Sequence, residues 1–193
     1  MKALVILGSP RINMNTDTLL NEVIKGLQSQ NVEVEKIILS RLKFEPCIAC
    51  DVCAETGHCY KQDDLTSIYD KFNNSDIIIV GSPMYFNSVT AITKAMIDRC
   101  QSFWSSKYKL NRSSIDRNRK RRGMFVGVGG AKYTELEKGF IGATVVMELF
   151  FRATNTEYMY NMLVDNTDEV FVGDREELLK EAYEMGIKLT KTE

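Results

Sequence analysis

Short apolar runs that alternate with segments of helical periodicity constrain the fold of this chain more than any other feature. "ALVILG" (3–8), "DIIIVGS" (76–82) and "GMFVGVGG" (123–130) are short and present no polar face. Strands that helices cover on both sides have this pattern, which is typical of a parallel sheet. "VEVEKIIL" (32–39) and "YMYNMLV" (158–164) are two further strands with a weaker signal.

The segments between these runs carry apolar residues at helical spacing. They lie near 19–27, 65–72, 88–103, 140–150 and 175–190, with Asp63 or Asp64 as a candidate cap of the second. Strands that alternate with helices imply right-handed crossovers. Five such units predict an α/β fold of three layers, flavodoxin-like, with a parallel sheet in the order 2-1-3-4-5. Residues 1–193 contain no evident linker or repeat, so we expect a single domain.

Composition excludes several classes of protein. The chain of 193 residues is 44% hydrophobic and 26% charged, which is typical of a globular domain, and its formal net charge is −1. This charge gives no general case for binding nucleic acid. No stretch approaches the roughly 20 apolar residues of a membrane span, and the N-terminus lacks the apolar core of a secretory signal. We therefore expect a cytoplasmic protein with neither nucleic-acid nor membrane partners.

The loop after the first strand, "GSPRINMNT" (8–16), gathers polar groups where a helix opens. In a fold of this kind ligands bind outside the carboxyl ends of the strands. Hydroxyls, an amide and a guanidinium beside free backbone N–H groups favour a phosphate. The loop is neither GxGxxG nor a Walker A sequence, which argues against a dinucleotide or triphosphate site. A well-capped helix start is the alternative interpretation.

Two more loops follow strands at the same edge of the predicted sheet. "GSPMYFNSV" (81–89) offers a stiff, partly aromatic wall that suits a flat ring system, although packing over the core explains it too. "GVGGAK" (127–132) contains consecutive glycines, which let the main chain approach a ligand closely or simply make a tight turn. The three loops together indicate one ligand site.

Residues 45–60, "EPCIACDVCAETGHCY", hold four of the five cysteines in the spacing C-x2-C-x2-C-x5-C. In a reducing compartment such a cluster favours a metal or redox site over disulfides. Zinc sites usually use two separated C-x2-C pairs, and this spacing does not divide in that way. One tight loop that reaches three corners, with a fourth cysteine further on, suits a cubane. A bare cysteine loop and a zinc site stay open as alternatives, and Cys100 is interpreted as a buried thiol.

The loop sequences "GSPRINMNT", "PCIACDVC" and "DIIIVGSPMYFNSVTAITKAMIDR" together resemble the NAD(P)H-dependent FMN reductases of flavodoxin-like fold, and more closely the iron–sulfur flavoproteins. The resemblance implies that the first loop holds the FMN phosphate, and that the other two contact the isoalloxazine. The residues implied at the phosphate are Ser9, Arg11, Asn15 and Thr16. Those implied near the ring are Pro83, Met84, Tyr85, Phe86, Asn87, Gly129 and Gly130. Those implied as ligands of a [4Fe–4S] cluster are Cys47, Cys50, Cys53 and Cys59.

The function that the resemblance implies is a redox protein with FMN and a [4Fe–4S] cluster. Electrons would enter from a ferredoxin-like donor and leave to a small acceptor, with dioxygen, peroxide and a quinone as candidates. No side chain need act as acid or base, and the single histidine, His58, argues against a Ser-His-Asp hydrolase. The cysteine loop leaves the second strand, so we expect the cluster toward the flavin pocket, in a homodimer or homotetramer.

Two other functions and one basic segment stay open at this point. The chain could be a cluster-free NAD(P)H-dependent FMN or quinone reductase, or an electron carrier or sensor without a dedicated substrate. "KYKLNRSSIDRNRKRRG" (107–123) holds many cations against one acid, Asp116. It is interpreted as a solvated, mobile loop, or else as a docking patch for an acidic ferredoxin or the phosphate of NADPH.

Overall fold

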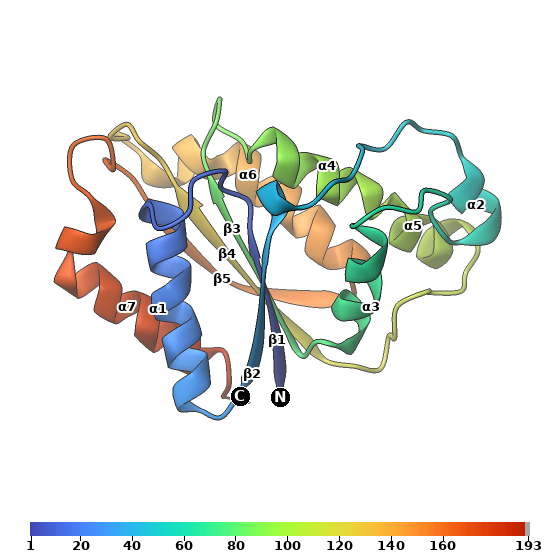
Figure 1. Cartoon of the computed structure of the whole chain (residues 1–193), viewed down its shortest axis with the longest axis horizontal. Helices are drawn as coiled ribbons and strands as arrows, with labels where there is room; N and C mark the ends of the chain where they lie inside the picture. Colours follow the sequence, from blue (N-terminus) through green and yellow to red (C-terminus); the bar gives the residue numbers. More distant parts are fainter. Residues whose placement is uncertain (192–193) are drawn as a thin grey trace.

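The computed structural model describes residues 1–191, and its sheet has the predicted order. All five strands are parallel and lie side by side as β2-β1-β3-β4-β5 (Figure 1). Their bounds are β1 Lys2–Leu7, β2 Glu33–Ile38, β3 Ile77–Pro83, β4 Arg121–Val128 and β5 Thr156–Val164. The three strands with continuous apolar sequence are the central ones, which confirms the interpretation of those runs as doubly covered strands.

Helices cover both faces of the sheet, so the molecule has three layers (Figure 1). One face carries α1 (Asn15–Ser29) and α7 (Glu176–Lys188); the other carries α3 (Thr66–Asn74), α4 (Ala91–Arg99), α5 (Gln101–Trp104) and α6 (Leu136–Ala153). The short segments are α2 (Val52–Thr56), the π-helical turn η2 (Ser105–Lys109) and the 3-10 turns η1 (Leu39–Arg41) and η3 (Val172–Asp174). None of the helices within residues 1–191 has the length and apolar character of a membrane span.

Alternation along each strand divides the core into two clusters, one on each face. Along β3, Ile77 and Ile79 pack on the α1 and α7 side, whereas Ile78 and Val80 pack on the other. Helices α1 and α7 approach each other closely, because Gly26 has no side chain where a Cβ would lie 2.1 Å from the Tyr183 carbonyl oxygen. Packing on both faces therefore holds the strands in place, and with them the carboxyl edge of the sheet where the predicted ligand loops begin.

Buried hydroxyl groups hold the first two ligand loops against each other. Thr90 caps α4, and its Oγ1 donates to the Gly8 carbonyl oxygen at 2.7 Å. The backbone N–H of Thr90 donates to Ser82 Oγ at 3.1 Å, and the N–H of Gly8 donates to the Gly81 carbonyl oxygen at 2.7 Å. A Cβ on Gly8 would lie 1.9 Å from Thr93 Oγ1, so the close approach requires glycine. These bonds tie the loops after β1 and β3 together at the carboxyl edge of the sheet.

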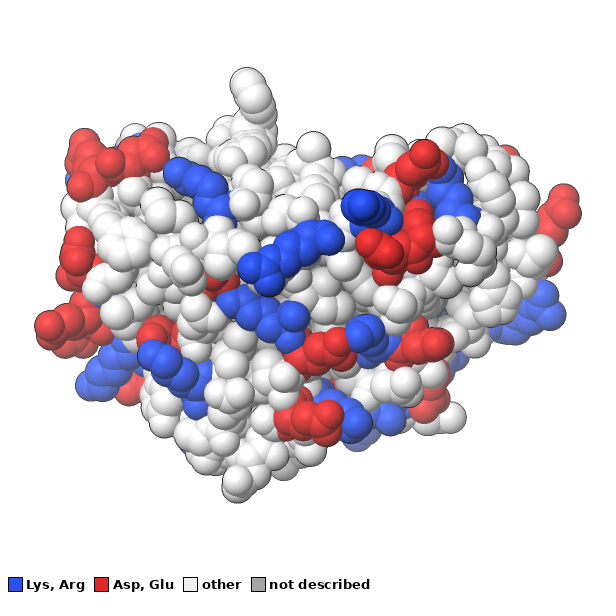
Figure 2. All heavy atoms as spheres, in the orientation of Figure 1, with Lys and Arg blue, Asp and Glu red and all other residues white. Residues whose placement is uncertain are grey.

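The basic segment is tied to the body of the protein and is not a free patch of charge. Arg121 is 1% exposed and donates to the carbonyl oxygens of Phe72, Asn73 and Asp116. Arg119 bonds Asp76 at 2.8 Å, at the amino ends of the strands. The interpretation of 107–123 as a solvated loop is therefore wrong for Arg121, whereas Arg119 is half-buried and Lys109, Arg112, Arg117 and Lys120 are exposed. Figure 2 shows positive and negative side chains interspersed over the face that it displays.

Candidate functional site

A cavity of about 280 Å³ lies at the carboxyl edge of the sheet and brings together most of the residues predicted at the flavin. It is lined by Ser9, Arg11, Asn15, Thr16, Pro83, Met84, Tyr85 and Gly130, with Met14, Val128, Ala131, Tyr133, Thr167 and Asp168. Its volume is just below the roughly 300–1,000 Å³ of small-molecule pockets. The loops after β1, β3 and β4 thus converge as predicted.

The loop after β1 presents an open helix start to this cavity. Helix α1 has Met14 at its N-cap and no side-chain cap bond, which leaves backbone N–H groups free near Thr16. Thr16 is 3% exposed. Asn15 has a different use, because its Oδ1 accepts the Val172 N–H at 2.9 Å and its Nδ2 donates to the Thr167 carbonyl oxygen. Its side chain fastens the loop to the segment after β5.

Three residues predicted near the ring do not line the cavity. Phe86 is 107% exposed and, with Asn87, has a left-handed backbone at the tip of the loop after β3, which projects from the top of the molecule (Figure 1). Asn87 Oδ1 accepts the hydroxyl of Tyr133 at 3.2 Å. Gly129 is buried, and its N–H donates to the Val164 carbonyl oxygen. Only Tyr85 of the aromatic pair lines the cavity.

The segment after β5 supplies two lining residues that the sequence analysis missed. Thr167 Oγ1 and the N–H of Thr167 both donate to the Gly129 carbonyl oxygen, and the Asp168 N–H donates to that of Gly130. The signal was present, because "DNTDE" (165–169) is a polar cluster directly after a strand of the same sheet. The carboxyl ends of parallel strands meet at one edge, so a fourth loop belonged to the site.

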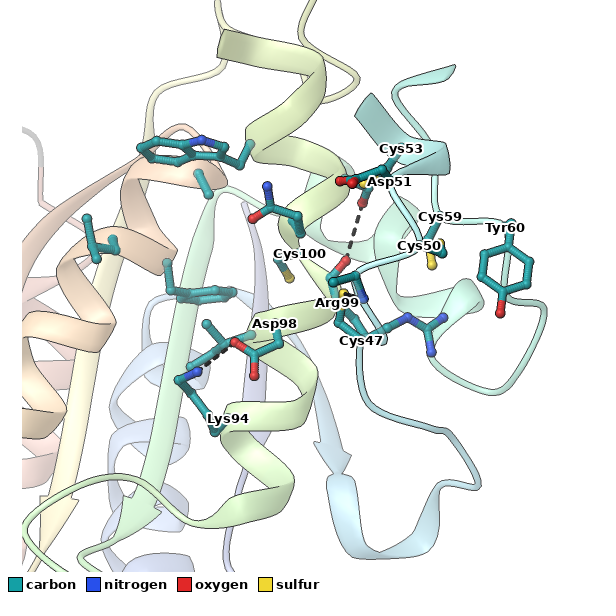
Figure 3. Close-up of a pocket in the computed structure, with 18 of the residues that line it drawn as sticks. Cys47, Cys50, Asp51, Cys53, Cys59, Tyr60, Lys94, Asp98, Arg99 and Cys100 are labelled. Carbon is teal, nitrogen blue, oxygen red and sulfur yellow. Dashed lines mark hydrogen bonds and ion pairs between the residues drawn. The ribbon is translucent and has the colours of Figure 1, made fainter. Parts of the chain in front are cut away.

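A second cavity, of about 600 Å³, contains the cysteines of residues 45–60. Cys47, Cys50, Cys53 and Cys59 all line it, together with side chains of α4, α5 and α6. Figure 3 shows these four on the side of the cysteine loop and Cys100 on the helix opposite. Cys100 is 2% exposed, and burial raises the pKa of its thiol. Its prediction as a buried thiol is confirmed.

The cysteine loop is fastened at its start by a buried ion pair. Arg99 donates from Nη1 to Asp63 Oδ2 at 2.7 Å and to the Glu45 carbonyl oxygen at 2.8 Å, and from Nη2 to Asp63 Oδ1 at 3.2 Å. Asp63 also accepts the Leu65 N–H just before α3, so the predicted capping aspartate acts mainly as the partner of Arg99. Tyr69 donates its hydroxyl to the Arg99 carbonyl oxygen at 3.1 Å.

The charges of this ion pair reinforce each other. Burial works to raise the pKa of Asp63, but the bonds from Arg99 and from two backbone N–H groups outweigh it, and the pKa lies below its ordinary value. Burial works against the charge of Arg99, yet the bond to Asp63 and the nearby Tyr69 and Cys59 leave its pKa raised. Both groups are therefore charged at neutral pH.

The other end of the cysteine loop rests on the π-helical turn η2. Cys53 Sγ lies 3.7 Å from Ser105 Oγ, and Arg112 Nη2 donates to the Thr56 carbonyl oxygen at 3.2 Å. Gly57 turns the chain with φ at +81°, and a Cβ there would lie 3.3 Å from Ser106 Cβ. The predicted helix 88–103 continues into this turn. Turns of π-helix are rare in proteins, and those that occur are frequently found at functional sites.

The backbone between the cysteines is strained. Ala49 has φ at +53° and Asp51 has φ at +61°, one on each side of Cys50. A left-handed conformation costs a residue other than glycine roughly 1–2 kcal/mol, and it persists only where the surroundings impose it. The left-handed residues Ala49 and Asp51 change the direction of the backbone between successive cysteines. The Ala49 N–H also points to Cys47 Sγ, at 3.5 Å.

The two cavities are separate within one chain. They share no lining residue, because the first lies at the ends of β1, β3 and β4 and the second between the cysteine loop and helices α4 to α6. The sequence analysis expected the cluster to lie toward the flavin pocket. Within one chain, no side chain that lines the cysteine cavity also lines the cavity at the carboxyl edge of the sheet. Leu149 of α6 lines the cysteine cavity and belongs to an apolar row on that helix, with Ile141 and Val145.

Comparison with known proteins identifies the family of this chain. Residues 1–137 match the family model described as NADPH-dependent FMN reductase. An iron–sulfur flavoprotein of Methanocaldococcus jannaschii is 40% identical over 99 residues, which are 51% of this chain and 51% of that protein. The chain spans about half the length of the curated relatives it matches.

Solved structures show the same fold at low sequence identity. An NAD(P)H:quinone oxidoreductase from Methanothermobacter marburgensis has a TM-score of 0.71 at 15% identity and covers 100% of this chain and 98% of its own. A flavodoxin from the domain Archaea has a TM-score of 0.57 at 17% identity, covering 98% of this chain and 96% of its own. The fold is thus flavodoxin-like, as predicted. With the family model matching most of its length, this chain belongs to the NADPH-dependent FMN reductase family.

Proposed function

We propose that this protein is a flavin-dependent oxidoreductase that binds FMN at the carboxyl edge of the sheet and a [4Fe–4S] cluster in the cysteine cavity. Electrons are taken from a ferredoxin-like donor and delivered to a small acceptor such as dioxygen, peroxide or a quinone. The observation that carries the proposal is that four thiols of one short loop line a single cavity, next to a buried guanidinium. The family match to FMN reductases supports the flavin.

The first cavity suits FMN by the chemistry of its walls. The open start of α1, the hydroxyl of Thr16 and the guanidinium of Arg11 offer donors to a phosphate. The Ser9 hydroxyl lines the same cavity and donates to the Arg11 carbonyl oxygen at 3.1 Å. Pro83, Met84 and Tyr85 form an apolar wall at the end of β3, which suits a flat ring. These residues bind and orient the cofactor, and the exposed face of Tyr85 leaves room for a ring larger than the cavity.

The second cavity suits an iron–sulfur cluster by donor type and number. Four thiols, a strained loop and a buried cation meet there. Among residues 1–191, however, no three His, Cys, Asp or Glu side chains are arranged so that they hold a metal ion. The thiols share a cavity without forming a finished site, so binding has to draw them together.

The chemistry at the two cavities differs in kind. When bound, an iron–sulfur cluster passes single electrons, and a flavin accepts them one at a time and releases them as a pair. The chain itself holds the cofactors and sets their surroundings, with Cys47 and Cys50 exposed and Cys53 and Cys59 half-buried. Cys47, Cys50, Cys53 and Cys59 are the proposed cluster ligands, and no side chain is required as acid or base.

The exposed row on α6 supports assembly with a second copy of this chain. Ile141 is 60% exposed, Val145 51% and Leu149 48%, at successive turns of one helix. Exposed apolar patches of this kind mark interfaces. Because Leu149 also lines the cysteine cavity, a second copy on this face would complete the wall of that cavity.

Replacing Val145 with glutamate is expected to reduce the assembly to monomers, since it places a charge at the centre of a buried apolar contact. Light scattering after gel filtration measures the mass directly. Lys180→Glu on α7 is the matched control, because it adds a glutamate at an exposed helical position on the other face of the sheet. A wild-type protein that is monomeric, or a Val145→Glu variant of unchanged mass, contradicts this interface.

The decisive experiment on the proposed function is the cofactor content of protein purified without oxygen. We expect about one FMN, about four iron atoms and about four acid-labile sulfides per chain. After reduction with dithionite, the sample should show the electron paramagnetic resonance signal of a reduced cluster. Oxygen-free handling matters because exposed clusters are lost in air. Material with neither cofactor, even after reconstitution, contradicts the proposal as a whole.

A cluster-free NAD(P)H-dependent FMN or quinone reductase is the second candidate, and the match of residues 1–137 to the NADPH-dependent FMN reductase family favours it. It predicts flavin without iron, and rapid reduction of the flavin by NADPH. Turnover with dioxygen, peroxide and a quinone then separates an enzyme from an electron carrier, because a carrier shows no sustained turnover with any of the three.

A further inference from the structure

A buried arginine beside the cysteines retains one unused hydrogen-bond donor. Arg99 is 1% exposed, and its Nε is the one buried side-chain nitrogen or oxygen without a hydrogen-bond partner in the part of the chain that the structure describes. Buried polar groups are almost always hydrogen-bonded. An orphan donor in a well-packed site therefore points to a partner that this chain does not supply, either a ligand or a bound water.

The position of this donor is fixed by the rest of the guanidinium. Nη1 and Nη2 are held by both carboxylate oxygens of Asp63 and by the Glu45 carbonyl oxygen. The guanidinium is planar and rigid, so two anchored nitrogens set the direction of the third N–H. Arg99 has no freedom to turn Nε toward another protein atom without breaking the bonds to Asp63.

The residue that carries this buried donor is one of those that line the cysteine cavity. Arg99 lines it together with Cys47, Cys50 and Cys59, and Figure 3 shows its side chain running from the helix toward the cysteine loop among these labelled residues. A positively charged side chain is thus held beside the cavity that the four thiols line.

We propose that Arg99 is a positioning residue whose Nε–H donates to a sulfur atom of the iron–sulfur cluster held by the four cysteines, and that this contact raises the cluster's reduction potential. The inference rests on the proposed function, because it needs the cluster. Reduction adds one electron to an already anionic group, so a cation and a hydrogen bond stabilise the reduced form more than the oxidised form.

The chain offers an internal control for a simple effect of charge. Lys94 lines the same cavity, but it is 48% exposed and paired with Asp98 at 2.7 Å. Exposed charges act weakly because water screens them. Removing the charge of Lys94 should therefore leave the potential nearly unchanged, whereas removing Arg99 should not.

The test is a redox titration of the anaerobic holoprotein, followed by the resonance signal of the reduced cluster, with iron content measured on each sample. The main variant is Arg99→Met with Asp63→Asn, which removes both partners of the buried pair and leaves the net charge of the chain unchanged. Arg99→Lys keeps a positive charge but lacks Nε–H. Lys94→Met is the control.

We expect the equilibrium constant for reduction of the cluster to be about tenfold lower in the double variant than in wild type. For a one-electron couple this lowers the reduction potential by about 59 mV. In Arg99→Lys the same constant should be about threefold lower than in wild type, and in Lys94→Met it should stay within about twofold of wild type. If the double variant does not retain iron, Arg99→Lys decides alone: a fall supports the inference and an unchanged potential overturns it.

An unchanged or higher potential in a loaded double variant also overturns the inference, and leaves a bound water as the partner of Nε. A fall of equal size in Lys94→Met overturns it too, because the effect would then be one of general charge. Wild-type protein without iron is a different result, since it rejects the cluster itself and not the role of Arg99.

Discussion

Replacing Cys50 with alanine is expected to remove the iron and acid-labile sulfide of the anaerobic protein while its FMN stays in place. Cys50 lies between the two left-handed residues of the cysteine loop, and its thiol is the central one of the three closely spaced proposed ligands Cys47, Cys50 and Cys53. A cubane loses much of its binding free energy with one thiolate, and we expect iron to fall from about four per chain to less than one. Iron, sulfide and flavin are assayed on the same sample.

The control for this prediction is Cys100→Ala. Cys100 is buried on the helix opposite the cysteine loop, and its sulfur faces the Met96 carbonyl oxygen at 3.4 Å. This variant should keep its iron. Full iron in Cys50→Ala would exclude this thiol as a ligand. Loss of flavin together with iron would mean that the two sites are coupled, although their cavities share no lining residue.

The second large effect is expected at the phosphate end of the flavin cavity. Changing Thr16 to valine and Arg11 to methionine together removes a hydroxyl and a guanidinium donor without a large change in volume. Hydrogen bonds to charged groups contribute about 1.5–3 kcal/mol each, so affinity for FMN should fall by about 100-fold or more. Quenching of flavin fluorescence during titration of the apoprotein measures the dissociation constant.

Thr18→Val is the matched control for the flavin prediction. Thr18 lies on the same helix, two residues beyond Thr16, and does not line the cavity at the edge of the sheet. Its affinity for FMN should match that of wild type. If the double variant still binds FMN as tightly as wild type, the phosphate does not lie at the start of α1, and the proposed orientation of the flavin is wrong.

Parallel strands of continuous apolar sequence made the sheet predictable. "DIIIVGS" and "GMFVGVGG" have no polar face, so they had to be central, and the loops that follow them had to meet at one edge. The convergence of Ser9, Thr16, Met84 and Gly130 on one cavity follows from that topology alone. The assignments of individual residues to FMN and to the cluster stay predictions.

The structure differs from what local sequence suggests at two residues whose surroundings depend on the fold. Phe86 reads as part of an aromatic wall, but a left-handed turn sends it into solvent. Arg121 reads as part of a charged loop, but three backbone carbonyl oxygens bind it inside the protein. Neither result can be read from composition, because a charge run looks the same whether it is solvated or buried.

The sequence alone determined the order of the strands, the edge at which ligands bind and the spacing of four thiols, because these depend on periodicity and on short-range geometry. Only the tertiary structure brought Arg99 of α4, Asp63 before α3 and the carbonyl of Glu45 together beside those thiols. These residues are up to 54 positions apart. No local pattern records such a meeting, because it arises from the packing of separate helices and loops on the sheet.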